Sequence, residues 1–417
     1  MLAERRPIPL RQEVGIADTA VNPGVVLGRE WVIKVTKLCN LRCRYCYEWN
    51  TLANPERMSL SLWDRIFRTI RMMNERDEAL MGFAGRDQII WHGGEPTLLP
   101  LDYLESVMAC QRAAIPENWL ESGRLVHRLQ TNLFALSDAK IDFFQRHRFG
   151  IGISFDVIPG ARLDMRGQAT EERILRNMAR LSSKGINTGL IVVIAGHTAR
   201  NIDVVYRYLR DRGQLCRVLP LFNGPAERPM DDLVLERDEI NDALMRLFVL
   251  WFEDGCPFPI RPLNEYLAIV IMKMLDLKRS IFYDRRVIGD KVIVVELDGH
   301  IYEPCAGFGP SQALGNLATQ TMDEILVSEH YASSLAYNDD VRNAVCSRCE
   351  FFDACGSKEM FMSSDGGAEE SRCMTAQPLF RSIERYLNEN NIGPDILQGL
   401  AMEYLESVGS IQPLMPV

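Results

Sequence analysis

A regular alternation of strand-like and helix-like segments restricts the fold of this chain more than any other feature. Six short apolar runs, rich in β-branched residues, are each followed by a segment of helical period. Such alternation predicts βα units around a parallel sheet, and six units fit an incomplete barrel better than a closed barrel of eight. The sequence therefore predicts an α/β fold, a partial (β/α)6 TIM-like barrel. The expected strands are residues 31–35, 88–91, 125–130, 150–155, 188–194 and 215–221, and the expected helices are residues 59–74, 101–114, 137–146, 171–184, 199–210 and 238–253.

The strand–helix rhythm stops after residue 222, which divides the chain into regions. Beyond it we expect a helix over residues 263–277 and a terminal helix over residues 377–390. Asp298-Gly299, between two apolar runs, predicts a β-hairpin with a type I′ turn. The expected regions are an N-terminal arm (1–30), the core barrel (31–225), a helical connector (226–290) and a C-terminal domain with its helix (291–417).

Composition excludes several classes of function. The net charge is −9, so no general basic surface is available for nucleic acid. The N-terminus lacks the apolar core of a secretory signal, and no run of about 18 apolar residues occurs. We therefore expect a cytoplasmic protein with neither a nucleic-acid nor a membrane partner. In that reducing compartment the eleven cysteines are not expected to pair, and their clustering indicates metal or iron–sulfur ligation.

Three cysteines, Cys39, Cys43 and Cys46, lie on a short loop that follows the first expected strand. In parallel βα folds the carboxyl ends of the strands hold the active site. Three thiolates can hold three irons of a [4Fe–4S] cubane and leave the fourth iron open to a chelating ligand. Tyr45 and Tyr47 would add an aromatic wall beside it. A zinc site is the alternative, although zinc usually takes four ligands and prefers C-x2-C pairs.

The C-x3-C-x2-C spacing, with an aromatic residue before the last cysteine, resembles the signature of the radical S-adenosylmethionine (SAM) superfamily over residues 31–222. A Gly-Gly-Glu stretch after the second strand looks like the family motif whose backbone binds the amino group of SAM. A Thr-Asn pair follows the third strand, and a Ser-x-Asp with a downstream Arg follows the fourth, as in many members. The SAM-binding residues that the resemblance implies are Tyr45, Gly93, Gly94, Glu95, Thr131, Asn132, Ser154, Asp156 and Arg166.

Four later cysteines resemble the end of the SPASM domain of radical SAM peptide maturases. Four thiolates complete the coordination of a cubane, so this auxiliary cluster would not bind SAM; a structural zinc is the alternative. A full SPASM domain carries seven cysteines and two auxiliary clusters, but Gln320 and Glu359 replace two of them here. We therefore expect one auxiliary [4Fe–4S] cluster in a C-terminal SPASM/twitch-like iron–sulfur domain. Its expected ligands are Cys346, Cys349, Cys355 and Cys373.

The resemblance also implies a reaction. A reduced cluster donates an electron to SAM, and the resulting 5′-deoxyadenosyl radical abstracts a hydrogen atom from the substrate. Flavodoxin or ferredoxin would supply the electron. The SPASM-like ending favours a ribosomally made precursor peptide as substrate, modified by a crosslink or an oxidation. Glu303 and Cys305, after the hairpin, are candidate catalytic residues near the barrel mouth, Cys305 as a hydrogen-atom donor.

Two other functions remain open from the sequence. The chain could be a dehydrogenase or epimerase that acts on a small-molecule substrate such as an aminoglycoside. It could also be a non-catalytic iron–sulfur scaffold. The intact three-cysteine motif and the Gly-Gly-Glu stretch argue against the scaffold.

Overall fold

A single curved sheet organises the protein. The computed structural model describes residues 28–221, 232–276, 292–302, 312–334, 336, 346–355, 373, 376–393 and 396. Within these residues the strand order is β10-β9-β8-β1-β2-β3-β4-β5-β6-β7. The strands are β1 (Glu30–Thr36), β2 (Asp87–Gly93), β3 (Leu125–Thr131), β4 (Gly150–Ser154), β5 (Thr188–Ile194), β6 (Cys216–Pro220), β7 (Ile260–Arg261), β8 (Val292–Val295), β9 (His300–Tyr302) and β10 (Gly315–Asn316).

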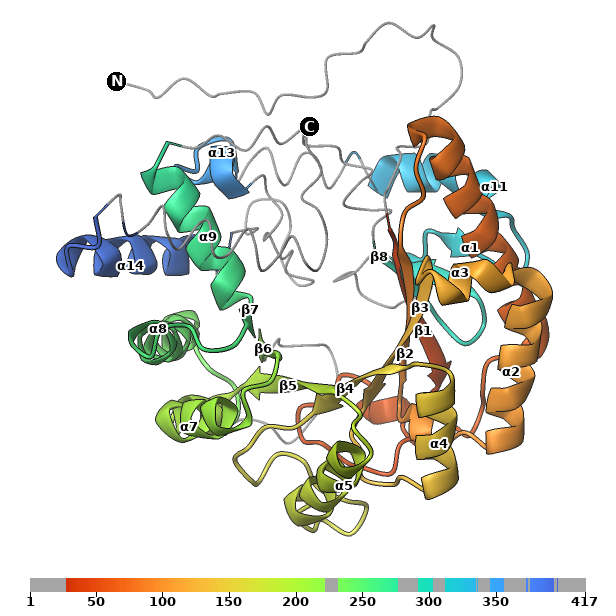
Figure 1. The fold of residues 1–417 in the computed structure, drawn as a ribbon, viewed down its shortest axis with the longest axis horizontal. Helices are drawn as coiled ribbons and strands as arrows, with labels where there is room; N and C mark the ends of the chain where they lie inside the picture. The colour runs from red at the N-terminus through yellow and green to blue at the C-terminus, as the bar shows by residue number, and fades with distance from the viewer. Residues whose placement is uncertain are drawn as a thin grey trace, which may run out of the picture.

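The strands β1 to β7 pair in chain order and are all parallel. This confirms the predicted α/β fold with a parallel sheet. In Figure 1 the sheet forms an open arc with the helices on its outer side. The helices are α1 (Leu60–Met81), α2 (Leu101–Ala114), α3 (Glu117–Glu121), α4 (Asp138–Arg146), α5 (Glu171–Ser183), α6 (Gly196–Ala199), α7 (Ile202–Arg212), α8 (Arg237–Glu253), α9 (Leu263–Met274), α11 (Met322–Leu326), α13 (Phe352–Cys355) and α14 (Ala376–Glu389), with 3-10 turns η1 (Trp49–Thr51) and η2 (Pro96–Leu98).

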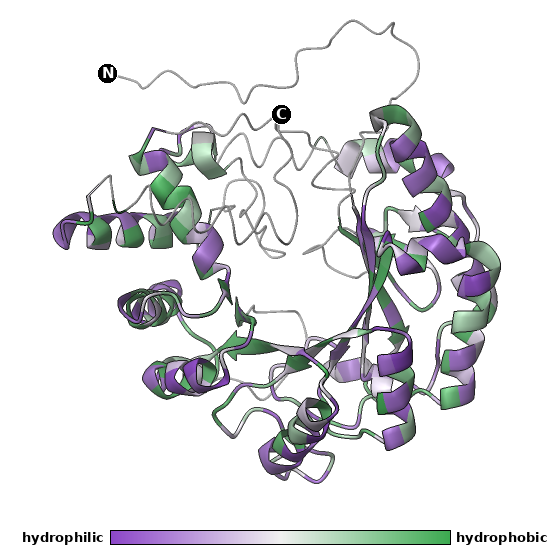
Figure 2. Ribbon diagram, viewed as in Figure 1, coloured by the Kyte–Doolittle hydropathy of each residue, from purple (hydrophilic) through white to green (hydrophobic). Residues whose placement is uncertain are grey.

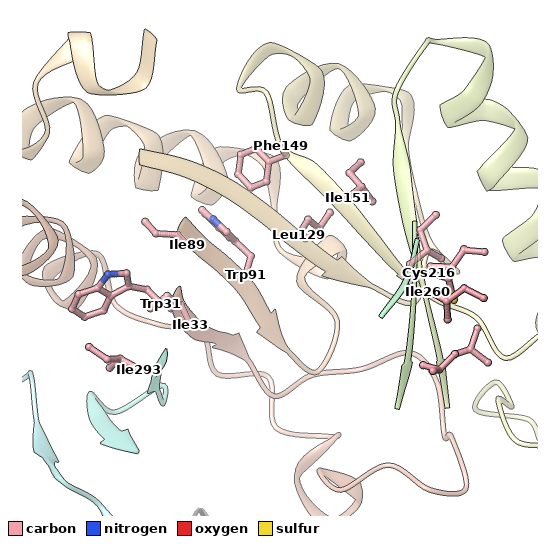
Figure 3. Close-up of a cluster of buried hydrophobic side chains, with 14 of the residues drawn as sticks. Trp31, Ile33, Ile89, Trp91, Leu129, Phe149, Ile151, Cys216, Ile260 and Ile293 are labelled. Atoms are coloured by element: carbon pink, nitrogen blue, oxygen red, sulfur yellow. The ribbon is translucent and has the colours of Figure 1, made fainter. Parts of the chain in front are cut away.

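The hydrophobic core lies between the outer face of the sheet and these helices. In β1, Trp31, Ile33 and Val35 are fully buried, and alternate residues of a strand point to the same face. Figure 3 shows Trp31, Ile33, Trp91, Leu129 and Ile151 gathered on this face. The helices complete the layer with their hydrophobic sides, while their hydrophilic sides face outward (Figure 2). The opposite, inner face of the sheet is therefore left for polar side chains and for function.

Local signals explain where several helices begin and end. Ser59 precedes α1 and accepts a hydrogen bond from the N–H of Leu62 at 3.2 Å. Ser137 precedes α4 and accepts one from the N–H of Lys140 at 3.3 Å. Serine is a favoured N-cap residue, because its side-chain oxygen accepts a hydrogen bond from a backbone N–H of the first turn. Helix α1 continues to Met81, beyond the predicted end, and stops where Gly82 adopts a φ of 79°.

A hairpin from the C-terminal part of the chain joins the barrel sheet. Strand β8 pairs in parallel with β1, and β9 returns antiparallel to β8. The predicted hairpin is thus present, but the prediction of a type I′ turn is wrong. A type I′ turn needs positive φ at both Asp298 and Gly299, and only Gly299 has it, at 90°. The N–H of Gly299 donates to the carbonyl of Glu296 at 3.0 Å, so the tight turn begins one residue earlier than predicted.

The domain boundaries stay proposals. The expected linker at residues 223–230 lies outside the described residues, as does most of the expected arm. Strands β8 to β10 come from the proposed C-terminal domain and lengthen the sheet of the proposed barrel. Among the described helices, none is long and apolar enough to cross a membrane.

Candidate active site

The loop after β1 carries the three cysteines to the carboxyl edge of the sheet. It is fixed by backbone hydrogen bonds at both ends: the N–H of Cys39 donates to the carbonyl of Leu52 at 3.0 Å, and the N–H of Cys46 to that of Cys43 at 2.9 Å. Its middle is held by the segment after β4, because the N–H of Arg42 donates to the carbonyl of Leu163 at 2.7 Å. The cysteine loop is therefore built jointly by β1 and β4.

The three thiols of this loop are free and face a common protein interior. Burial, as the largest cause, raises the pKa of Cys39 and of Cys43 to about 12 each, and it also raises the pKa of Cys46. The neighbouring thiols Cys43 and Cys46 raise the pKa of Cys39 further, so the three groups lie close together. Without a metal the thiols therefore hold their protons, and a metal that binds them releases those protons.

The donor set fits an iron–sulfur cluster. Three free cysteine thiols on one buried loop are soft ligands of the kind that Fe–S clusters take. In the described part of the chain, no three His, Cys, Asp or Glu side chains converge closely enough to hold a single metal ion. A cubane spaces its thiolates more widely than one ion does. The backbone N–H of Leu41 and the Nδ2 atom of Asn132 approach the Sγ atom of Cys39 at 3.4 and 3.6 Å, as donors to a cluster thiolate would.

Two glycines at the end of β2 let this strand approach the cysteine loop. A Cβ atom on Gly93 would lie 2.2 Å from the carbonyl oxygen of Thr36. One on Gly94 would lie 2.3 Å from the carbonyl oxygens of both Lys37 and Leu38. The N–H of Gly94 donates to the carbonyl of Thr36 at 2.7 Å. Only glycine fits here, because any Cβ would collide with backbone that cannot move aside.

We expect Gly94→Ala to damage the site while leaving the fold largely intact. The new methyl group must push the backbone that precedes Cys39, and a shift of about 1 Å at a catalytic position can cost about 100-fold in rate. SAM-dependent 5′-deoxyadenosine formation and iron content measure the effect. Gly393→Ala is the matched control, because Gly393, like Gly94, does not have a positive φ, and nothing lies within 4 Å of the new Cβ. Equal activity of the two variants would contradict this role of Gly94.

Glu95 joins the ends of β2 and β3. Its Oε1 atom accepts hydrogen bonds from the N–H and the hydroxyl of Thr97, at 2.9 and 2.6 Å, and from the hydroxyl of Thr131 at 2.7 Å. Its Oε2 atom accepts the N–H of Asn132 at 2.7 Å. Burial outweighs these bonds and raises the pKa of Glu95. The carboxylate is occupied within the protein, which favours a positioning role for Glu95 and Thr131.

Asn132 links this scaffold to the cysteine loop. Besides its approach to Cys39, its Nδ2 atom donates to Oδ1 of Asn40 at 3.0 Å, and its own Oδ1 accepts the N–H of Phe134 at 2.9 Å. Ser154, at the end of β4, accepts a hydrogen bond on Oγ from Nε2 of Gln130 at 2.7 Å. Both residues lie at the carboxyl edge where the sequence places them.

A buried charge cluster surrounds Asp156. Its carboxylate forms an ion pair with Nε of Arg162 at 3.2 Å and lies 3.7 Å from Nε2 of His197. It also accepts hydrogen bonds from the N–H of Val193 at 3.2 Å and from the hydroxyl of Tyr45. Burial alone would raise the pKa of Asp156, but the Arg162 guanidinium and these donors hold it below its ordinary value. Asp156 is therefore an anchor for Tyr45 of the cysteine loop.

The guanidinium at this site belongs to Arg162, not to the sequence candidate Arg166. Arg162 is buried, its Nη1 atom lies 3.8 Å from the Sγ atom of Cys43, and its guanidinium lies 5.4 Å from the centre of the Tyr45 ring. The side chain of Arg166 is exposed, and its backbone N–H donates to Asp164 at 2.8 Å. The structure therefore does not bring Arg166 into the cluster.

A second charged network, which sequence reasoning missed, joins the cysteine loop to the hairpin. The Nζ atom of Lys34 lies on the inner face of β1 and bonds Oε1 of Glu48 at 3.2 Å. Lys37 bridges Oε2 of Glu48 at 3.0 Å and Oε2 of Glu296 at 2.6 Å. Burial alone would raise the pKa of Glu48, but Lys34 and Lys37 lower it to about 2. The network is neutral and ties the turn after β8 to the residues around Cys46.

The expected catalytic residues Glu303 and Cys305 lie outside the described residues. The described register nevertheless shows which part of the hairpin meets the carboxyl edge. Val295 of β8 lies opposite Ile33 of β1, so the turn with Glu296 reaches that edge, and β9 runs back from it. The expectation that the hairpin carries Glu303 and Cys305 to the mouth therefore has no support from the described strands.

Three of the four later cysteines lie close to one another. Burial raises the pKa of Cys373 to about 11, and the neighbouring Cys346 and Cys349 raise it too. The side-chain Nε2 and the backbone N–H of Gln377 approach Cys349 at 3.5 Å and Cys373 at 3.3 Å. Cys355 ends α13 in the adjoining core. These thiols also fit an iron–sulfur cluster, and their assignment as its ligands is a proposal.

Comparisons with known proteins agree with this arrangement. A family model described as the radical SAM superfamily matches residues 33–209, and one described as an iron–sulfur cluster-binding domain, SPASM, matches residues 287–350. A cysteine-type anaerobic sulfatase-maturating enzyme of Clostridium perfringens is 25% identical over 376 residues, which is 85% of this chain and 96% of the relative. A serine-type enzyme of Bacteroides thetaiotaomicron is 22% identical over 353 residues, 78% of this chain and 80% of the relative.

Solved structures show the same fold. The native enzyme anSMEcpe with bound AdoMet superposes with a TM-score of 0.66 at 20% identity, covering 89% of this chain and 99% of that one. Streptococcus suis SuiB bound to its precursor peptide SuiA has a TM-score of 0.54 at 14% identity, over 84% and 75% of the two chains. The two matched domains imply a SAM-binding [4Fe–4S] cluster and auxiliary iron–sulfur binding. With its cysteine loop at the carboxyl edge of a parallel half-barrel, this chain is a radical SAM enzyme that carries a C-terminal SPASM domain.

Proposed function

We propose that this enzyme modifies a side chain of a peptide or protein substrate by oxidation or by formation of a crosslink. The observation that carries the proposal is the extent of its likeness to sulfatase-maturating enzymes, one of which it matches over 96% of that relative's length. A structure of the same fold holds both AdoMet and a peptide, Cp18Cys. Those relatives are named for cysteine- and serine-type maturation, so a cysteine or serine side chain is the proposed target.

The proposed SAM-binding groups lie at the carboxyl edge. We assign three irons of the SAM-binding cluster to Cys39, Cys43 and Cys46, and the SAM contacts to the backbone at Gly93 and Gly94. When bound, the cluster and SAM supply a radical able to abstract a hydrogen atom from an unreactive C–H bond. The protein's task is to hold that C–H bond close to the radical and to exclude water.

The surrounding residues hold this geometry. Glu95 and Asn132 fix the ends of β2 and β3 relative to Cys39, and Asp156 with Arg162 fixes Tyr45 and Cys43. None of these contacts needs to change during a reaction. We assign them a positioning role, in which they keep the cysteine loop in one arrangement.

The auxiliary group and the partners complete the proposal. We assign Cys346, Cys349, Cys355 and Cys373 to one auxiliary [4Fe–4S] cluster, which supplies electron transfer when bound. A flavodoxin or ferredoxin is the proposed electron donor, and the cytoplasm, where such donors and free thiols coexist, is the proposed compartment.

The reaction test uses the reconstituted enzyme with dithionite, SAM and peptides that carry a cysteine or a serine. We expect 5′-deoxyadenosine together with a modified peptide. A crosslink, or a serine oxidised to an aldehyde, leaves the peptide two hydrogen atoms lighter, whereas a cysteine oxidised to an aldehyde also exchanges its sulfur for the oxygen of water and releases hydrogen sulfide. An oxidised side chain that is an aldehyde reacts with a hydrazide probe, whereas a crosslinked peptide does not, so the probe separates the two outcomes.

Other outcomes of the same test would contradict the proposal. Product formed only in a parallel incubation with an aminoglycoside would support a small-molecule dehydrogenase or epimerase instead. If no substrate gives 5′-deoxyadenosine although both clusters are present, the chain acts as an iron–sulfur scaffold.

A further inference from the structure

Arginines gather on the inner face of the barrel. Arg128 of β3, Arg217 of β6 and Arg261 of β7 are all exposed, while their strand neighbours Cys216 and Ile260 are buried against the helices. Because side chains alternate along a strand, these arginines point into the lumen. We call these three residues, with Arg86 just before β2, the arginine group.

Two glycines on β4, which have no side chains, make room for the side chains of β3. A Cβ atom on Gly150 would lie 2.2 Å from Nη1 and 2.9 Å from Cδ of Arg128, so the arginine lies flat across this strand. On the same strand, a Cβ on Gly152 would lie 2.7 Å from Oε1 of Gln130. The side chains of Arg128 and Gln130 therefore lie over the glycines of β4.

Among the described residues, the arginine group carries more positive charge than its neighbours neutralise. Arg261 pairs with Glu265 at 3.6 Å, while Arg86, Arg128 and Arg217 have no ion pair or side-chain hydrogen bond with any residue in the described ranges. The surrounding protein partly desolvates the Arg128 guanidinium, although the residue is exposed, and so lowers its pKa; Arg86 and Arg261 lower it too, against a smaller opposite effect of Glu30.

The strand register adds to this imbalance. Arg217 and Arg261 lie directly opposite each other in the β6–β7 pair, where like charges destabilise a sheet. This concentration of cations stands out in a chain of net charge −9.

We propose that the arginine group binds a carboxylate of the peptide substrate, an inference that rests on the peptide-modifying function proposed above. Guanidinium groups recognise carboxylates through paired N–H donors, and several of them on one wall can share the same anion. Gly150 of β4 lets Arg128 lie against this strand. The lumen thereby holds the substrate at one end while its target side chain reaches the cysteine loop at the other.

The register sets where that carboxylate lies along the peptide. Arg128 precedes Thr131, at the carboxyl end of β3, by three residues. At about 3.3 Å per strand residue this is roughly 10 Å, a distance that an extended peptide covers in about three residues. We expect an acidic side chain, or the C-terminal carboxylate, about three residues from the modified side chain.

Peptide binding without turnover tests the site. Three pools of mixed-sequence heptapeptides are offered to the reconstituted full-length enzyme with SAM and without reductant. One pool has blocked ends and a central aspartate, the second has blocked ends and a central asparagine, and the third has a central asparagine and a free C-terminal carboxylate. Retained peptides are quantified by mass spectrometry. We expect the wild type to retain one of the carboxylate pools about fivefold to tenfold better than the blocked asparagine pool, as a charge-assisted contact would.

Variants of the arginine group test whether these arginines cause the preference for a carboxylate pool. Arg128→Gln, and the double variant Arg128→Gln with Arg261→Gln, should reduce it toward equal retention, and both positions are exposed enough to tolerate glutamine. Arg176→Gln on the outer surface of α5 is the matched control and should keep it, because that side chain is 66% exposed. The pool that is preferred identifies the source of the carboxylate.

The result overturns the inference if the wild type retains all pools equally, retains none, or keeps its preference in the double variant. Turnover is not needed for any of these readings. The peptide-modifying function is judged separately by 5′-deoxyadenosine and product mass, so either proposal can fail while the other stands.

Discussion

Replacement of Cys39, Cys43 and Cys46 by alanine should remove about four irons per chain, from about eight to about four, because each cubane holds four. The variant should form no 5′-deoxyadenosine at any SAM concentration, because no other described thiols lie at the carboxyl edge of the barrel. Iron and sulfide quantification, with 5′-deoxyadenosine measured after dithionite reduction, checks both expectations.

Two controls define the result. Cys110→Ala removes a thiol outside both groups, whose Sγ atom lies 3.9 Å from the carbonyl oxygen of Leu60, and should keep the full iron content. Replacement of Cys346 and Cys349 should remove the other half of the iron. A wild-type content of about twelve irons, three cubanes of four, would contradict the single auxiliary cluster. Full iron in the triple variant would contradict the assignment of the loop thiols.

Arg162→Met should destabilise the enzyme by about 3–5 kcal/mol, because it leaves a buried carboxylate without its main charged partner. Arg162 and Asp156 are both buried and lie 3.2 Å apart, and Asp156 also anchors Tyr45. Without the guanidinium, the pKa of Asp156 should rise, since burial then acts with less opposition. Urea unfolding of the reconstituted enzyme, together with iron content, measures the loss.

Arg166→Met is the matched control for this prediction. Its side chain is exposed, so we expect a change within about 0.5 kcal/mol. The two variants also test which arginine acts at the site, because the family resemblance implies Arg166 and the geometry favours Arg162. If Arg166→Met abolishes SAM binding while Arg162→Met leaves it unchanged, Arg166 is the SAM contact that the family resemblance implies, and the positioning role that we assign to Arg162 is wrong.

Most of the barrel could be predicted because its signals are local. A buried strand and an amphipathic helix each show their period within a few residues, so α2 and β5 begin and end where the sequence predicts. The two-residue strand β7 could not be seen, because two residues carry no period. The hairpin was visible, but its turn type was not, since the position of the turn within Glu296–Gly299 depends on the strand register.

The contacts around the site were harder to predict because they join distant segments. Arg162 lies in a loop, where no period marks a buried residue, and meets Cys43 only because that loop bonds the cysteine loop. Glu296 meets Lys37 only through the parallel pairing of β8 with β1, a long-range contact that no sequence window contains. The motif residues Glu95 and Asn132 were found, but their mutual hydrogen bond was not.

We propose above all that the three loop thiols leave one iron of the SAM-binding cluster open to SAM. Pulsed electron–nuclear double resonance on the one-electron-reduced Cys346→Ala, Cys349→Ala enzyme, with SAM labelled by nitrogen-15 at its amino group, tests this directly. The account predicts a hyperfine coupling between the cluster spin and the labelled nitrogen, which disappears when unlabelled SAM replaces the labelled form. Saturating SAM that binds without any such coupling would show that the fourth iron is not its site and would contradict the account.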